Sequence, residues 1–162
     1  MALPQTLLSS EIAAGTKLPP LRYPVSATTV VLGAMASRDW RPMHHDRDFA
    51  INRNGVKDIF LNTPTQAGWL ERYLFDWSGP GARLAKMRFA MKESIFPGTE
   101  MRFSGNVTEV AADTRGDWAW VDVKLAIHVD GDTLATECEA RLALPVHPEI
   151  NLWSVPTTDW NP

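Results

Sequence analysis

The apolar residues of this chain follow a helical period in one central segment. In residues 64–77 they recur at i, i+3, i+7 and i+10 and form one stripe: Ala67, Leu70, Leu74 and Trp77. This spacing predicts an amphipathic helix. Thr63 is placed to cap its free amides, Pro64 suits the first helical position, and Gln66 follows Thr63 by three residues, as in a capping box.

The second half of the chain changes to a period of two, which indicates half-buried strands. We predict strands at residues 25–32, 85–91, 101–110, 121–129 and 134–144. Asp130-Gly131 separates the last two of these and is typical of a tight hairpin. A short helix is also predicted at residues 46–54, because Asp46 is a favourable N-cap.

The order of these elements predicts an α+β fold. One long helix between a first strand and four consecutive strands has only the antiparallel sheet to pack against, so the sheet should curve around it as in the hotdog fold. We expect an N-terminal arm at residues 1–22, a single hotdog domain at 23–145 and a C-terminal tail at 146–162. Such a sheet exposes an edge, so pairing with a second hotdog subunit is expected, as a homodimer or a heteromer.

Composition narrows the function classes. With 16 Lys plus Arg against 19 Asp plus Glu, the net charge of -3 argues against nucleic acid as a partner. Every apolar stretch is interrupted before it reaches the length of a membrane span, and the first residues lack the pattern of a secretory signal. A single cysteine, Cys138, fits a reducing compartment, so a cytoplasmic location without membrane association is expected. Because Cys138 falls on the apolar face of a strand, it should pack in the core rather than act as a nucleophile.

The loop between the first strand and the long helix carries the candidate chemistry. Asp39 and His44 lie five positions apart, and Pro42 between them restricts both its own backbone and that of Arg41. Addition of water to an enoyl thioester needs a base for the water and an acid for the α carbon, and a carboxylate with an imidazole can supply both. The free amides at the start of the helix, at Asn62 and Thr63, suit the developing enolate oxygen.

The loop resembles the hydratase signature of the MaoC-like family. The residues that carry the resemblance are Asp39, Pro42, Met43, His44 and Ala50. Arg38 stands where that family usually has Gly, and Arg41 where it usually has Asn. The segments SRDW, HHDRDFA, KDIFLN, ERYLFDWSGP and FSGNVTEV, which span residues 38–110, are similar to the small MaoC-like subunits of bacterial steroid side-chain degradation.

This resemblance implies a hotdog enoyl-CoA hydratase or 3-hydroxyacyl-CoA dehydratase, with Asp39 and His44 as the catalytic pair. It implies an acyl-CoA substrate with a bulky, steroid-like acyl group and a second hotdog subunit that completes the site. CoA is then part of the substrate, and no separate cofactor or metal is expected. The direction of the reaction and the acyl group stay open.

The same residues allow other interpretations. His44, His45 and Asp46 could ligate a metal, but neighbouring loop residues point apart and no second zinc-spaced pair exists. Trp40, beside Asp39, is a candidate for lining the substrate site. The chain could also be a non-catalytic subunit that shapes an acyl tunnel, or a thioesterase using Glu71, the one carboxylate well inside the long helix.

Overall fold

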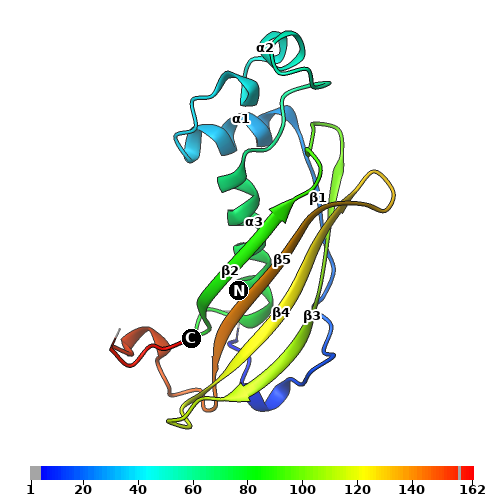
Figure 1. The fold of residues 1–162 in the computed structure, drawn as a ribbon. Coiled ribbons are helices and arrows are strands. Elements are labelled where there is room, and N and C mark those ends of the chain that lie inside the picture. The colour runs from blue at the N-terminus through cyan, green and yellow to red at the C-terminus, as the bar shows by residue number, and fades with distance from the viewer. Residues whose placement is uncertain (1–4, 157) are drawn as a thin grey trace.

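One antiparallel sheet and one long helix form the body of the molecule (Figure 1). The computed structural model describes residues 5–156 and 158–162. The strands are β1 Leu21–Pro24, β2 Arg83–Met91, β3 Glu100–Ala112, β4 Trp118–Val129 and β5 Thr133–Pro145, in the spatial order β1-β3-β4-β5-β2. The helices are α1 Ala27–Ala36, α2 Arg47–Asn52 and α3 Thr63–Ser78, with 3-10 turns η1 Ser9–Glu11, η2 Pro42–His44 and η3 Leu152–Ser154. The predicted α+β hotdog architecture is confirmed.

The apolar stripe of α3 lies against the concave face of the sheet. Leu70 and Leu74 are fully buried, and they share one core with the inward side chains of β4: Val121, Val123, Leu125, Ile127 and Val129. Removing apolar surface of this kind from water is the main favourable contribution to folding. The long strands therefore fix α3, and with it the position of its N-terminus.

The start of α3 differs from the predicted cap. Asn62 is the N-cap, and its side-chain oxygen accepts a hydrogen bond from the amide of Thr65 (3.1 Å). Thr63 is thus already the first helical residue and Pro64 the second. Gln66 does not close a capping box, because its side chain turns inward to the sheet. Asparagine outranks threonine as an N-cap, which explains the shift by one residue.

The predicted strand at residues 25–32 is wrong. This segment begins α1, whose N-cap Ser26 accepts a hydrogen bond from the amide of Thr29 (3.0 Å). Val30 and Ala34, four residues apart, are its buried positions. The β-branched residues of this segment favour a strand by intrinsic propensity. The helix forms because Ser26 caps its first turn and because its buried residues follow a helical spacing. The first strand, β1, lies just before it and pairs with β3.

The remaining strands and the short helix α2 agree with the sequence pattern. Asp130 and Gly131 both have positive φ, of 45° and 87°, within the tight turn of residues 130–132 that joins β4 to β5. Asp46 is the N-cap of α2, as predicted. A bulge between Leu84 and Lys86 turns Ala85 to the outer face of the sheet, whereas a strict period of two from Met87 and Phe89 predicts that Ala85 faces the core.

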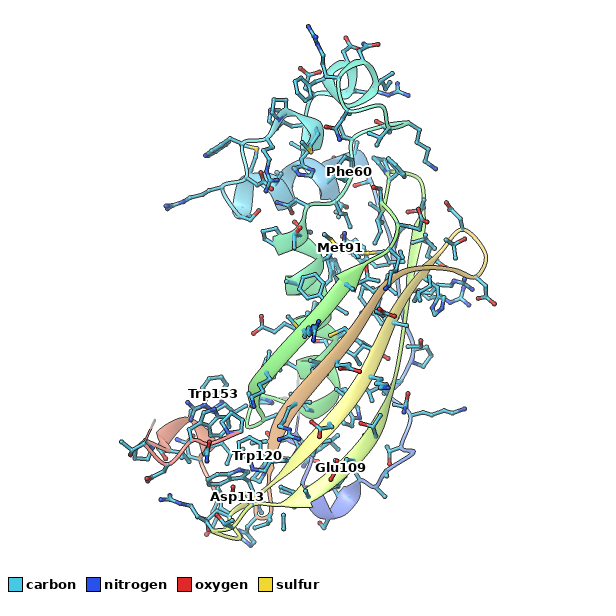
Figure 2. The ribbon with its side chains drawn as sticks, in the orientation of Figure 1. Phe60, Met91, Glu109, Asp113, Trp120 and Trp153 are labelled. Carbon is cyan, nitrogen blue, oxygen red and sulfur yellow. The ribbon has the colours of Figure 1, made fainter. Side chains whose placement is uncertain are left out.

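Both ends of the chain pack on the sheet. Leu18, before β1, is buried and its amide donates to the carbonyl of Gly105 on β3 (2.9 Å). At the other end, Leu152 is fully buried in a second cluster on the outer face, together with Trp118 and Trp120. Figure 2 shows Trp120 and Trp153 near one end of the sheet and Phe60 at the opposite end of the molecule. None of the helices described here combines the length and apolar character that crossing a membrane requires.

Candidate active site

The segment from α1 to α2 forms an overhang above one end of the sheet, next to the start of α3 (Figure 1). A β-carbon at Gly33 would overlap the side chain of Thr65, so this glycine lets α1 approach the first turn of α3. After α1 the chain reverses at Arg38, whose φ of 54° lies in the left-handed region that favours glycine. The MaoC-like signature usually has Gly at this position, and here an arginine adopts the left-handed conformation that glycine favours.

His44 lies in η2 and is almost fully buried. Its Nδ1 is 2.8 Å from the carbonyl oxygen of Phe60. A carbonyl oxygen only accepts, so Nδ1 carries the proton and donates it. In the neutral ring Nε2 then holds a free lone pair, and this atom is 3.5 Å from Oδ2 of Asp39. The backbone before α3 therefore selects the His44 tautomer that presents a basic nitrogen to Asp39.

Asp39 is held through both carboxylate oxygens. Asn62 Nδ2 donates to Oδ2 (3.1 Å), while Arg41 donates to Oδ1 from its Nε (3.0 Å) and its backbone amide (3.3 Å). Burial alone would raise the pKa of Asp39, but the hydrogen bonds from Asn62 and Arg41 and the charge of Arg41 bring that pKa below its usual value. The carboxylate is thus ionised at neutral pH and fixed in orientation.

Asn62 connects the loop that carries Asp39 and His44 to the long helix. Its side chain is buried, caps α3 through Oδ1, and donates through Nδ2 to both Asp39 and the hydroxyl of Ser37 (2.8 Å). Ser37 Oγ in turn donates to the carbonyl of Gly33 (2.8 Å). One amide side chain therefore fixes the distance between the Asp39 carboxylate and the N-terminus of α3.

A cavity of about 300 Å³ opens beside this group. It is lined by residues of the loop, of the start of α3 and of the end of β2: Asp39, Arg41, Met43, His44, Phe60, Leu61, Asn62, Thr63, Gln66, Met91, Lys92, Glu93 and Ser94. Figure 2 shows Phe60 and Met91 at the same end of the molecule, where β2 ends below the overhang. The cavity joins two proton-transfer groups to a helix N-terminus, with apolar side chains around them.

Of the five residues predicted for the site, four lie together at the cavity and one does not. Asp39, His44, Asn62 and Thr63 all line the same cavity. Trp40 does not join them, because its side chain is 65% exposed and is not part of the cavity wall. His45 is also exposed, and within residues 5–156 and 158–162 no three His, Cys, Asp or Glu side chains are grouped to hold a metal ion. Glu71, the carboxylate considered for thioester hydrolysis, is exposed on α3 and lies outside the cavity wall.

Sequence reasoning missed three contributors to this site. The Phe60 carbonyl sets the His44 tautomer, and a backbone atom leaves no sequence signal. The sequence identifies Arg41 only as a departure from the family signature, whereas in the structure Arg41 forms an ion pair with Asp39. Gln66 was assigned to a cap, but it is buried in the cavity wall and accepts a hydrogen bond from Thr136 of β5 (2.6 Å).

Comparison with known proteins places this geometry in context. No family model matches the chain. It is 38% identical over 96 residues to the 3-oxo-4,17-pregnadiene-20-carboxyl-CoA hydratase beta subunit of Mycobacterium tuberculosis, a match that covers 59% of this chain and 74% of that protein. Among solved structures, a chain of the ChsH1-ChsH2 complex from M. tuberculosis superposes with a TM-score of 0.73 at 30% identity, covering 81% of this chain and 97% of that one.

More distant structures share the fold. The (R)-hydratase from A. caviae involved in PHA biosynthesis has a TM-score of 0.72 at 24% identity, covering 83% of this chain and 98% of that one. The MaoC-like dehydratase from Rhodospirillum rubrum has a TM-score of 0.77 at 18% identity, covering 88% and 99%. The identity to the hydratase beta subunit, together with the hotdog architecture, shows that the chain belongs to the MaoC-like family of hydratases and dehydratases.

Proposed function

We propose that this chain is a catalytic subunit of an enoyl-CoA hydratase, which adds water to a trans-2-enoyl-CoA or removes it from a 3-hydroxyacyl-CoA. The observation that carries the proposal is the approach of Asp39 Oδ2 to the free Nε2 of His44 at 3.5 Å, beside the start of α3. A water molecule beside this pair, within hydrogen-bond reach of both acceptors, can donate one hydrogen to each of them. Its oxygen then has a lone pair free for the substrate.

The proposed reaction is general acid-base catalysis. One member of the pair takes a proton from water while the water oxygen bonds to the β carbon. The π electrons of the double bond move toward the thioester and leave an enolate oxygen. The proton then passes to the α carbon, and the enolate collapses to the 3-hydroxyacyl product. Atoms and charges balance without an electron carrier, so CoA enters only as part of the substrate.

The ion pair between Arg41 and Asp39 supports catalysis over a purely structural subunit. Arg41 Nε binds Oδ1 and leaves Oδ2 facing His44. The departure from the family signature at this position therefore preserves the catalytic contact. Arg38 and Arg41, the two departures from the family signature, would favour a non-catalytic subunit if they disrupted the pair, but both are compatible with an intact contact between Asp39 and His44.

We also propose that the substrate carries a bulky, ring-containing acyl group and that a second hotdog subunit completes the site. The matched hydratase beta subunit is named for a pregnadiene-carboxyl-CoA, and one matched structure is a complex of two chains. The cavity of about 300 Å³ is at the small end of ligand pockets. It has room for the reacting end of such a substrate, and a partner surface would enclose the rest.

Turnover of enoyl-CoAs of graded bulk tests the proposal, using the chain alone and the chain co-expressed with a hotdog partner. Asp39→Asn keeps the size of the side chain and one acceptor oxygen but removes the basic carboxylate. We therefore expect kcat to fall by at least about 10²-fold. Tyr23→Phe, at a site in β1 outside the cavity wall, serves as a control. Undiminished hydration by Asp39→Asn would refute the mechanism, and absence of turnover with every substrate and partner would refute the function.

A further inference from the structure

The start of α3 offers few free backbone donors. Pro64, the second helical residue, has no N–H. The amide of Thr65 donates to Asn62 Oδ1 (3.1 Å), and that of Gln66 donates to the Asn62 carbonyl (3.2 Å). Among the described residues, only the Thr63 amide of this turn is left without an acceptor. A developing oxyanion is stabilised most by two or more donors aimed at it. The start of α3 supplies one of these donors, the Thr63 amide, and a second must come from elsewhere.

The side chain of Gln66 supplies another donor on the same wall. Gln66 is 1% exposed and lines the cavity together with Asp39, His44 and Thr63. Its Oε1 accepts the hydroxyl proton of Thr136 (2.6 Å), a fully buried residue of β5. This contact fixes the carboxamide and leaves Nε2 with no acceptor in the part of the chain described here. Helical side chains lean toward the N-terminus, so Gln66 reaches from the second turn back toward Thr63.

Several other donors around the cavity already have a partner. Arg41 binds Asp39, Asn62 Nδ2 is shared between Asp39 and Ser37, and Lys92 Nζ pairs with Glu137 (2.6 Å). Gln66 Nε2 is not among the buried side-chain atoms that lack a partner in the described part of the chain, so this atom is open to the cavity. Gln66 is therefore a polar group that the fold holds in place at the cavity while its donor stays available.

We propose that Gln66 contacts the substrate, with Nε2 donating to the thioester oxygen alongside the Thr63 amide, and that Thr136 is a positioning residue for Gln66. This inference rests on the proposed hydratase function. As the water oxygen bonds to the β carbon, the π pair of the C2–C3 double bond becomes the C1–C2 π bond of the enolate. The π pair of the C1=O bond moves onto the oxygen, which collects the negative charge. The two N–H groups stabilise that charge until C2 takes the proton.

Substitutions at Gln66 and Thr136 test the proposal in the active complex. Gln66→Glu keeps the shape and the acceptor for Thr136 but removes the donor at neutral pH, and Gln66→Met removes both polar groups. We expect kcat to fall by about 10²-fold in both variants while KM changes by less than about threefold, because the hydrogen bond strengthens as the oxygen becomes charged. Thr136→Val should reduce kcat by a smaller factor, and Thr136→Ser, which keeps the hydroxyl, should retain wild-type kcat.

A pH profile separates this role from a structural one. Protonation of the carboxyl restores a donor in Gln66→Glu, so its kcat relative to that of Gln66→Met should rise as the pH is lowered. A kcat within twofold of wild type in Gln66→Glu at neutral pH, or a loss confined to KM, would overturn the Gln66 proposal and leave the hydratase assignment intact. Absence of turnover by the wild-type complex on every enoyl-CoA would overturn both.

Discussion

Replacement of Asn62 by Asp probes the contact that links the loop of Asp39 and His44 to α3. The new carboxylate keeps an acceptor for the amide of Thr65 and therefore keeps the helix cap. It also puts an anionic oxygen where Nδ2 now stands, 3.1 Å from Asp39 Oδ2. Two unit charges at that distance repel each other by about 5 kcal/mol at an effective dielectric constant of about 20. The folded protein should therefore bind one proton between the two carboxyl groups.

The free energy needed to bind that proton sets the size of the destabilisation. A carboxyl with an ordinary pKa of about 3.9 binds a proton at pH 7 at a cost of about 4 kcal/mol, and at pH 5 at about 1.5 kcal/mol. The shared pKa in the folded state is raised above the unfolded value, so the folded state binds more protons. Stability is then lost as pH rises from about 4 toward that raised pKa. We expect Asn62→Asp to be destabilised by about 4 kcal/mol at pH 7 and by much less at pH 5.

Urea unfolding followed by tryptophan fluorescence at pH 5, 6, 7 and 8 measures this effect. Asn62→Ser is the matched control, because it retains a cap acceptor and adds no charge; its loss of stability should be nearly constant over the same range. A destabilisation of Asn62→Asp that does not change with pH would show that residue 62 does not face the Asp39 carboxylate. The proposed connection between the loop and the helix would then be refuted.

Two further predictions concern the segments that hold the chain ends. Leu152→Ala should lower the free energy of unfolding by about 2–4 kcal/mol, because Leu152 is fully buried in the second cluster, and a loss below about 0.5 kcal/mol in urea unfolding would contradict this packing. Burial raises the pKa of Tyr73 to about 12, and its hydroxyl donates to the Pro19 carbonyl (2.9 Å), so stability should fall as pH rises from 10 toward 12. Ultraviolet titration should resolve one tyrosine that ionises at high pH. This transition should disappear in Tyr73→Phe and persist in Tyr23→Phe, and a single transition near pH 10 for both tyrosines would contradict the prediction.

Local patterns in the sequence predicted the main elements of the fold. The helical stripe around Leu70 and Leu74 and the alternation along residues 121–129 reflect burial on one face, which each segment encodes by itself. Asp130-Gly131 predicted its hairpin because positive φ angles depend on the residue type at the turn. The segment at residues 25–32 failed because its β-branched residues favour a strand, while its burial in the fold requires a helix.

The sequence by itself determined that Asp39 and His44 are presented on a proline-restricted loop close to a helix start, because the motif and its spacing are local. Only the tertiary structure decided that the Phe60 carbonyl fixes the His44 tautomer and that Asn62 and Arg41 hold the Asp39 carboxylate. It also decided that Gln66 faces Thr136, a residue 70 positions away, and not its own helix cap. These contacts join segments that are far apart in the sequence and come together only when the sheet packs against α3. A local sequence pattern carries no information about which distant segments will be neighbours.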